Sequence, residues 1–272
     1  MELREQGRCR ALGVPVSWIR AWLDASPIAD LAMTFMREAT GRADPIEPLR
    51  PTRPAALATG RRIAFWSLVG GVGSSTTAAL VAHRSAAGGR PALLVDLDRW
   101  APSLALRARI EAATIADAIV QPGLENTLVS RWSAVPFLPG APALRGQLDV
   151  DRAIEVIDAI GGSGPVVLDL GAGADSLGAG LLSRIDRLCV VAGARASQLQ
   201  AVFCALELVR DLPCPAGLVI VGAADEDAAL IADRAGLPLL AAIPNDPYLA
   251  EDQFATRAPT LRAIDTLIRR IA

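Results

Sequence analysis

The chain has 272 residues, enough for one α/β domain of about 200 residues and a short appendage. Apolar residues make up 52% of it and aromatic residues 4%, which excludes a mostly disordered chain and favours close packing of helices on a sheet. The formal net charge of −2 offers no basic face for wrapping nucleic acid, so we expect no specific nucleic-acid partner.

The basic residues, the cysteines and the lack of long apolar runs indicate the cellular compartment and the kinds of site to expect. All 27 basic residues are arginine, so no lysine is present anywhere in the chain. The four cysteines form no CxxC pair, which predicts a reducing cytoplasm and no cysteine metal site. No apolar run approaches the ~18 residues of a membrane span, and no secretory signal pattern is present. We therefore expect a cytoplasmic protein; recruitment to the inner face of the membrane or to a cell pole stays open.

Residues 1–41 are expected to form a short helical arm. Trp18 and Trp22 belong to one apolar stripe, and Phe35 and Met36 belong to a second stripe at helical spacing. Residues 42–60 carry a proline at every third position from Pro45 to Pro54, which favours an extended linker. The arm could pack back onto the main domain or dock to a partner or second subunit.

From residue 61 to residue 272, apolar strand-like runs alternate with helical stretches. This alternation predicts a three-layer α/β domain with a mainly parallel sheet, in which ligands bind at the carboxyl ends of the strands. The expected strands are Ile63–Val69, Ala92–Asp96, Ala134–Leu138, Val166–Leu170, Leu188–Ala192, Leu218–Val221 and Leu239–Ile243. The expected helices lie near 75–87, 114–120, 150–160, 197–211, 226–235 and 259–271.

A glycine-rich loop follows the first strand and leads into a helix of small residues. Such a loop lets main-chain N–H groups converge on a phosphate, and the start of the helix adds further donors. In the usual loop, a lysine reaches the β- and γ-phosphates and a Ser/Thr hydroxyl binds Mg²⁺; here Ser74 and Ser75 hold these two positions. The residues expected to contact the phosphates are Gly70, Gly71, Val72, Gly73, Ser74, Ser75 and Thr76.

Three carboxylates and one late loop complete the candidate site. Asp96, Asp98 and Asp169 lie at the carboxyl ends of expected strands, where a carboxylate usually indicates a site, although each could instead cap the following turn. Asp246 follows Pro244 after the last strand and could face a nucleotide base or form an Asx turn. The single histidine, His83, has no catalytic partner in the sequence and is expected to be structural or solvent-facing.

These motifs resemble those of the deviant-Walker ParA/MinD ATPases, which are P-loop NTPases of the SIMIBI class. The segment from Val69 to Ala82 is similar to their KGGxGKT/S loop, with Val69 at the signature lysine and Ser74 at the standard lysine. The segments "ALLVDLDRWAPSLALRARI", "GPVVLDLGAG" and "GLPLLAAIPNDP" resemble the DxD strand, the Walker B strand and the loop beside the adenine base.

The resemblance implies a role for each matching residue. Asp98 would orient the attacking water if the protein is active, and Ser75, Asp96 and Asp169 would hold Mg²⁺ with bound ATP or ADP. Pro244 and Asp246 would lie beside the base. Val221 stands where family members often carry an asparagine that contacts the base, which weakens the case for adenine.

The run from "TIADAIVQPG" to "SAVPFLPGAP" is most similar to the CpaE/TadZ branch of localisation ATPases in Tad-type pilus and secretion systems. This resemblance implies a homodimer with a protein partner in such an assembly. Those proteins generally carry a larger receiver-like domain at the N-terminus, whereas this chain has the short arm. MinD relatives end in a membrane-binding amphipathic helix, so the last helix could contact a membrane peripherally or simply cover the sheet.

Both lysines of the family's loop are replaced, which predicts a pseudo-ATPase that binds nucleotide at most and serves as a localisation or assembly factor. One alternative is an active ATPase switch that dimerises with ATP and positions DNA or other cargo, with an arginine substituting in trans. The other is a structural interaction module with a vestigial nucleotide site.

Overall fold

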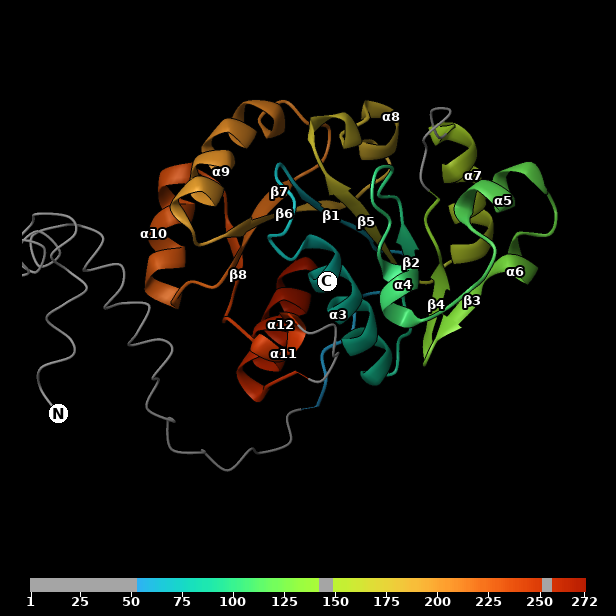
Figure 1. The fold of residues 1–272 in the computed structure, drawn as a ribbon, viewed down its shortest axis with the longest axis horizontal. Helices are drawn as coiled ribbons and strands as arrows, with labels where there is room; N and C mark the ends of the chain where they lie inside the picture. Colours follow the sequence, from blue (N-terminus) through green and yellow to red (C-terminus); the bar gives the residue numbers. More distant parts are fainter. Residues whose placement is uncertain (1–52, 142–148, 251–255) are drawn as a thin grey trace, which may run out of the picture. The chain divides into compact units, whose positions relative to one another are not determined.

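The computed structural model describes residues 53–141, 149–250 and 256–272, and Figure 1 shows their arrangement. The expected arm at 1–41 and most of the expected linker lie outside the described residues.

Eight strands form one sheet in the order β3-β4-β2-β5-β1-β6-β7-β8. All neighbouring strands in this described sheet pair in parallel except β3, which is antiparallel to β4. The seven strands predicted from the sequence are confirmed with small shifts of their ends, and β3 is an addition. The strands are β1 Arg62–Ser67, β2 Leu93–Asp96, β3 Ser130–Trp132, β4 Val135–Leu138, β5 Val166–Ala172, β6 Arg187–Gly193, β7 Ala216–Val221 and β8 Leu239–Ile243.

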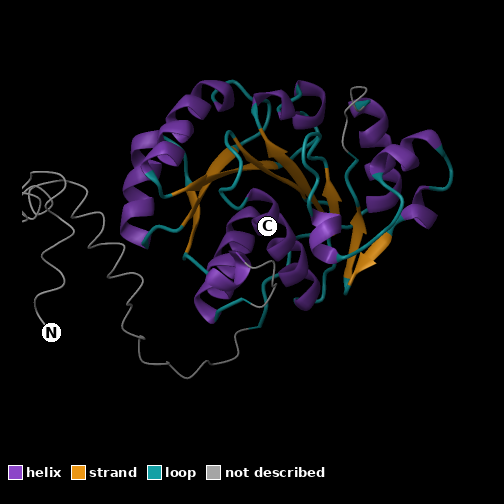
Figure 2. Cartoon of the chain, viewed as in Figure 1, coloured by secondary structure: helices purple, strands orange, loops and turns teal. Residues whose placement is uncertain are grey.

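Helices cover both faces of the sheet, which gives the predicted three layers (Figure 2). Alternate residues of each strand point to opposite faces, so the core divides into two apolar clusters. The first face carries helices α5 Ile115–Val120, α7 Val150–Gly161, α8 Ala179–Leu182, α9 Ala196–Val209 and α10 Asp225–Ala235. The second face carries α3 Ser74–Ala87, α4 Leu104–Ala108 and α12 Ala258–Ile271. Short helices α6 Glu125–Leu128 and α11 Pro247–Ala250 and a 3₁₀ turn at Ala174–Ser176 complete the described elements.

The order of the strands decides where the first loop lies. Strand β1 sits between β5 and β6, and β2 lies on the far side of β5, so the carboxyl ends of β1, β5 and β2 are neighbours. Helix α3 follows β1 directly and packs across the middle of the sheet through small buried residues such as Ala78, Ala79 and Ala82 (Figure 1). The start of α3 therefore faces the ends of β5 and β2, as expected for a ligand site at a reversal of strand order.

Helix α12 packs beside α3 and closes the second face. Its residues Ile264, Leu267, Ile268 and Ile271 are buried against the sheet, so its apolar stripe is used in the core. This agrees with the interpretation that the last helix covers the sheet. Among the described residues, no helix has the length and apolar character that crossing a membrane requires.

One ion pair joins α3 to α12. Arg84 donates from Nε and Nη2 to the two carboxylate oxygens of Asp265, at 2.8 and 2.7 Å. Asp265 also accepts the main-chain N–H of Ala55 at 2.9 Å, and Leu57 is fully buried in the same cluster, so this part of the expected linker is fixed to the domain. Burial alone would raise the pKa of Asp265, but the hydrogen bonds from Arg84 and Ala55 outweigh it and hold this pKa below its ordinary value.

We expect Asp265→Ala to lower the free energy of unfolding by about 2–4 kcal/mol, because it leaves Arg84 and the Ala55 N–H without their shared acceptor. Since the pKa of Asp265 is depressed, the stabilisation is present at neutral pH and is lost progressively below pH 3.8, the ordinary value. Urea denaturation at pH 7 measures the effect. Glu155→Ala, which breaks the exposed Arg152–Glu155 pair, is the control and should cause no measurable loss. Equal stability of Asp265→Ala and the unchanged protein would contradict this role.

Candidate functional site

The loop between β1 and α3 has the backbone of an anion-binding turn. Gly71 and Gly73 have φ values of 77° and 95°, which side-chain-bearing residues rarely adopt. A Cβ atom at Gly70 or Gly71 would meet nothing within 4 Å, so the turn borders open space there. Helix α3 begins after Gly73, which offers no side chain to cap the first N–H groups, and its first turn contains no acidic residue. These donors suit an anion.

Ser74 and Val69, which align with the two lysines of the loop that this segment resembles, have different surroundings. Ser74, in the lysine position, is 7% exposed, and its Oγ has no hydrogen-bond partner among the described residues. Val69, in the signature-lysine position, packs against the apolar cluster of the second face. Val72 is also buried in that cluster, so its main chain rather than its side chain could contact a phosphate. A buried hydroxyl without a partner at Ser74 fits a site that a ligand completes.

Asp96 and Asp169 lie directly opposite each other on the neighbouring strands β2 and β5. Strand alternation directs both side chains to the α3 face, and both residues are buried. The two oxygens of Asp96 accept the N–H groups of Asp98 and Leu104 at 3.1 and 3.2 Å. Asp169 accepts the N–H of Gly171 at 3.1 Å through Oδ1, whereas its Oδ2 has no hydrogen-bond partner among the described residues.

Burial and the negative charge of neighbouring carboxylates make Asp96 and Asp169 hard to ionise. Burial, and then the charge of Asp169, raises the pKa of Asp96 to about 8. Burial also raises the pKa of Asp169 to about 6, although the Ser75 hydroxyl and the Gly171 N–H favour its charged form. Keeping both carboxylates ionised at neutral pH therefore costs free energy, and a nearby cation would lower this cost.

Asp98 lies at the rim of the same site. Its Oδ1 accepts the N–H groups of Trp100 and Ala101 at 2.9 and 3.0 Å, the arrangement of an Asx turn. Gly171 has a φ of 67°, and a Cβ atom there would lie 2.3 Å from the carboxyl carbon of Asp98. Gly171, two residues after Asp169, therefore leaves room for the Asp98 carboxyl group, and the structure brings the three predicted carboxylates together.

One charged residue of this site was not predicted from the sequence. Arg107 of α4 donates from Nη1 to the Oγ1 of Thr76, in the first turn of α3. Its charge also favours the ionised form of Asp169, so the guanidinium contacts the helix after the loop and acts on one of the buried carboxylates. The signal available in the sequence was a basic residue soon after the DLD motif in a chain without lysine.

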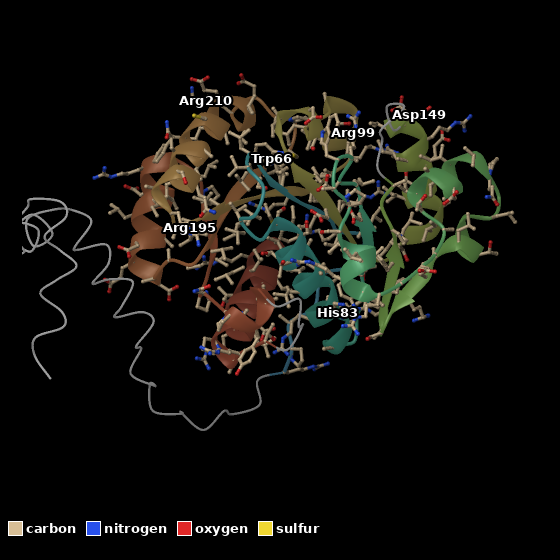
Figure 3. The ribbon with its side chains drawn as sticks, in the orientation of Figure 1. Trp66, His83, Arg99, Asp149, Arg195 and Arg210 are labelled. Atoms are coloured by element: carbon tan, nitrogen blue, oxygen red, sulfur yellow. The ribbon has the colours of Figure 1, made fainter. Side chains whose placement is uncertain are left out.

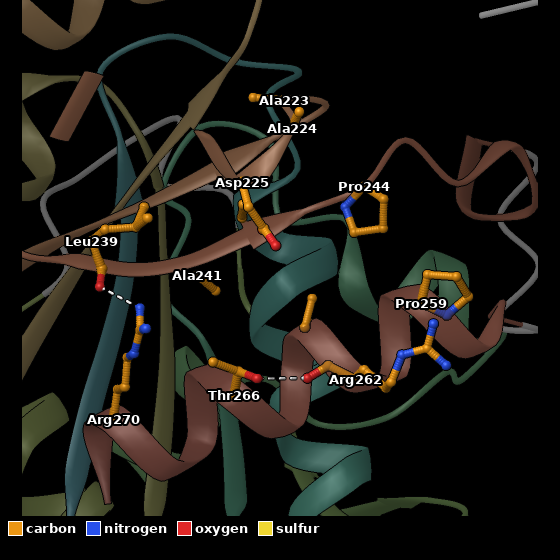
Figure 4. A pocket seen from close by; sticks show the side chains of 12 residues that line it. Ala223, Ala224, Asp225, Leu239, Ala241, Pro244, Pro259, Arg262, Thr266 and Arg270 are labelled. Atoms are coloured by element: carbon orange, nitrogen blue, oxygen red, sulfur yellow. Dashed lines mark hydrogen bonds between the residues drawn. The ribbon is translucent and has the colours of Figure 1, made fainter. Parts of the chain in front are cut away.

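The loop after β8, which carries Pro244 and Asp246, is held by hydrogen bonds to Asp246. Asp246 is buried and accepts hydrogen bonds from the N–H groups of Tyr248 and Arg257 and from the hydroxyl of Thr260. The contact from the Tyr248 N–H is that of an Asx turn, as one of the two interpretations expects, and the contacts from Arg257 and Thr260 fix the start of α12. Pro244 lines a hollow of about 580 Å³ whose other walls include Asp225 of α10 (Figure 4).

Val221 and His83, both singled out from the sequence, lie on β7 and α3. The Val221 side chain lies 3.8 Å from the position that a Cβ of Gly73 would take, so Val221 reaches the loop from β7. His83 on α3, labelled in Figure 3, packs edge-on against Trp132, with 4.7 Å between ring centroids, and burial lowers the pKa of His83. The contact with Trp132 agrees with a structural role for His83.

Trp66, labelled in the same figure, donates from Nε1 to the carbonyl of Gly173 at 2.8 Å and so ties β1 to the turn after β5.

The residues present fit Mg²⁺ and a phosphate chain. The Ser75 hydroxyl and the unpartnered Oδ2 of Asp169 are hard oxygen ligands of the kind that Mg²⁺ prefers, with Asp96 beside them. The start of α3 and the open glycine turn supply the donors for phosphate oxygens.

No family model matches the chain. The structure is similar to a ParA-family ATPase from Chlorobium tepidum, with a TM-score of 0.62 and 22% identity over 78% of this chain and 97% of that one. The chain has the fold of the ParA/MinD ATPases. MinD from Pyrococcus horikoshii complexed with Mg-ADP has a TM-score of 0.59 and 22% identity over 76% and 94% of the two chains. The MinC:MinD complex from Aquifex aeolicus has a TM-score of 0.61 and 16% identity over 77% and 94%.

Two uncharacterized proteins of Mycobacterium tuberculosis, from two strains, are each 37% identical to this chain over 205 residues. The match covers 67% of this chain and 54% of each relative, so the chain spans about half the length of the curated relatives that it matches.

We expect Asp169→Asn to stabilise the nucleotide-free and Mg²⁺-free protein at pH 8. Because burial raises both carboxyl pKa values above 3.8, the folded protein binds more protons than the unfolded chain between about pH 4 and 8, and its stability falls as the pH rises through that range. Removing one carboxylate should raise Tm at pH 8 by about 2–6 °C and flatten the dependence between pH 6 and 8.

Thermal unfolding followed by circular dichroism across this pH range measures both effects. Asp233→Asn, at an exposed position of α10, is the matched control and should leave the pH dependence unchanged. A lower Tm for Asp169→Asn at pH 8 would show that the paired carboxylates are not under electrostatic strain.

Proposed function

We propose that this chain is a ParA/MinD-type nucleotide-binding protein with weak or no ATP hydrolysis, and that it serves as a localisation or assembly factor for a Tad-type pilus or secretion system. The observation that carries the proposal is the combination found at the start of α3. The glycine turn, the buried hydroxyl of Ser74 and the carboxylates Asp96 and Asp169 are all in place, whereas neither lysine position holds a cation.

Binding of ATP or ADP is supported by the main chain of the loop. The N–H groups of the glycine turn and of the first turn of α3 would hold the phosphates, and Ser75 with Asp169 and Asp96 would hold Mg²⁺. A lost charge-assisted contact costs about 1.5–3 kcal/mol, which weakens binding by roughly one to two orders of magnitude and does not abolish it.

The replacement of both lysines should affect ATP hydrolysis more strongly than ATP binding. Bound Mg²⁺ would neutralise charge that develops on the phosphates, and Asp98 at the rim would orient a water. The cations that act on the transferring phosphate stabilise the transition state most, and an arginine finger alone is worth roughly 10³–10⁵ in rate. Turnover far below that of lysine-bearing ATPases follows from the replacement at Val69 and Ser74.

Dimerisation and partner binding are part of the proposal. MinD of Aquifex aeolicus forms a complex with MinC, and we infer an analogous use of this chain as a homodimer that binds a protein of the assembly, in the cytoplasm or at the inner face of the membrane. Trp100 and Leu106 support an interface near the loop. Both lie between the end of β2 and the end of α4, and 60% and 81% of their surfaces are exposed.

An active ATP-dependent switch that positions DNA or other cargo is the second candidate. It is favoured by the position of Asp98, which the structure holds next to Gly171 and therefore close to Asp169. The two candidates differ in whether hydrolysis depends on Asp98.

We expect the purified protein to bind ATP with Mg²⁺ in calorimetry, and Ser75→Ala to weaken this binding by about tenfold because it removes a proposed Mg²⁺ ligand. Hydrolysis should be as slow in the unchanged protein as in Asp98→Ala. A rate that falls at least about tenfold in Asp98→Ala would favour the active switch. No binding at millimolar ATP would leave only the structural module.

A further inference from the structure

In a chain without lysine, only arginine or a protonated histidine can supply a side-chain positive charge to a phosphate. Helix α4 brings one arginine to the loop. Arg107 donates to Thr76, which lies two residues after the position of the missing lysine, and it does so from the same chain.

Asp96 fixes the start of the helix that carries Arg107. Asp96 accepts the N–H of Leu104, the first residue of α4, at 3.2 Å, and the Leu104 side chain is fully buried. Arg107 follows three residues later and therefore lies on the same side of the helix as this anchor. Its own N–H donates to the carbonyl of Ser103 at 3.1 Å, so the main chain that carries the guanidinium is held in the helix.

The surroundings of the guanidinium are those of a phosphate site. It contacts the first turn of α3, where main-chain donors and the Ser75 hydroxyl gather, and its charge acts on Asp169. A guanidinium presents several N–H groups in one plane and can bind a hydroxyl and a phosphate oxygen together. The buried Oγ of Ser74 and the Oδ2 of Asp169 are polar atoms without hydrogen-bond partners in the described chain, and both belong to this same site.

We propose that Arg107 is the phosphate-binding cation of this site and takes, from helix α4, the place of the lysine that the loop lacks. This inference rests on the proposed function, because it requires that a nucleoside di- or triphosphate binds. It adds that the segment after the DLD motif supplies the missing positive charge in cis. Asp96 then has two roles, since it also fixes the helix that carries the arginine.

Calorimetric titration of the full chain with ATP and with ADP, each with Mg²⁺, tests this. We expect Arg107→Gln to weaken binding of both nucleotides by about 10- to 100-fold, the usual effect of losing a charge-assisted contact. Arg107→Lys should recover part of the loss, because it restores the charge without the planar fork. Thermal unfolding should show that the Arg107→Gln variant stays folded at the temperature of the titration.

Arg109→Asn is the matched control. Arg109 ends the same helix, is exposed, and has a φ of 54° that asparagine tolerates, so this variant removes the same charge and should change affinity by less than about twofold. An equal loss in both variants would point to the general field of the surface and contradict the proposal.

The remaining outcomes separate this inference from the function on which it rests. If the unchanged protein binds ATP and Arg107→Gln binds it equally well, Arg107 is not the cation and the proposed function stands. If Arg107→Gln binds more tightly, Arg107 acts as an internal substitute that blocks the site, and the inference is wrong. If the unchanged protein binds no nucleotide at millimolar concentration, both proposals fail.

Discussion

The candidate site is built around two buried carboxylates, Asp96 and Asp169, which lie near the start of helix α3. Asp96 and Asp169 occupy paired positions on β2 and β5, and burial raises the pKa values of both, with a further rise from the charge of Asp169 on Asp96 and from the charge of Asp98 on Asp169. The strand order puts them there, because β5 lies between β1 and β2 and helix α3 leaves β1 directly above them. Helix α4 is tied to Asp96 and Gly171 makes room for Asp98, so the surrounding elements are arranged around this pair.

Much of the fold follows from local sequence pattern. Seven strands were predictable because each is a short apolar run between turn residues, and six of the helices were predictable from their length and spacing. Strand β3, residues Ser130–Trp132, was missed because three residues with an arginine in the middle make no apolar run, and only pairing with β4 makes them a strand. Helices α4, α6 and α8 are too short to show helical periodicity.

The site was predictable where chemistry depends on residues adjacent in sequence. The glycine loop and the carboxylates at strand ends are local patterns, and the structure places them together. Arg107 could not be assigned in the same way, because its direction depends on the contact between Asp96 and Leu104, which no spacing rule contains. Asp246 fitted two interpretations, and only its three donors, from Tyr248, Arg257 and Thr260, favour the structural one.

A crystal structure of the protein grown with Mg²⁺ and a non-hydrolysable ATP analogue tests the central claim most directly. The account predicts phosphate oxygens on the N–H groups of the Gly70–Ser75 turn and Mg²⁺ between the Ser75 hydroxyl and the Asp169 carboxylate. A loop closed by its own side chains, or an analogue bound elsewhere while these amides stay without a ligand, would contradict it.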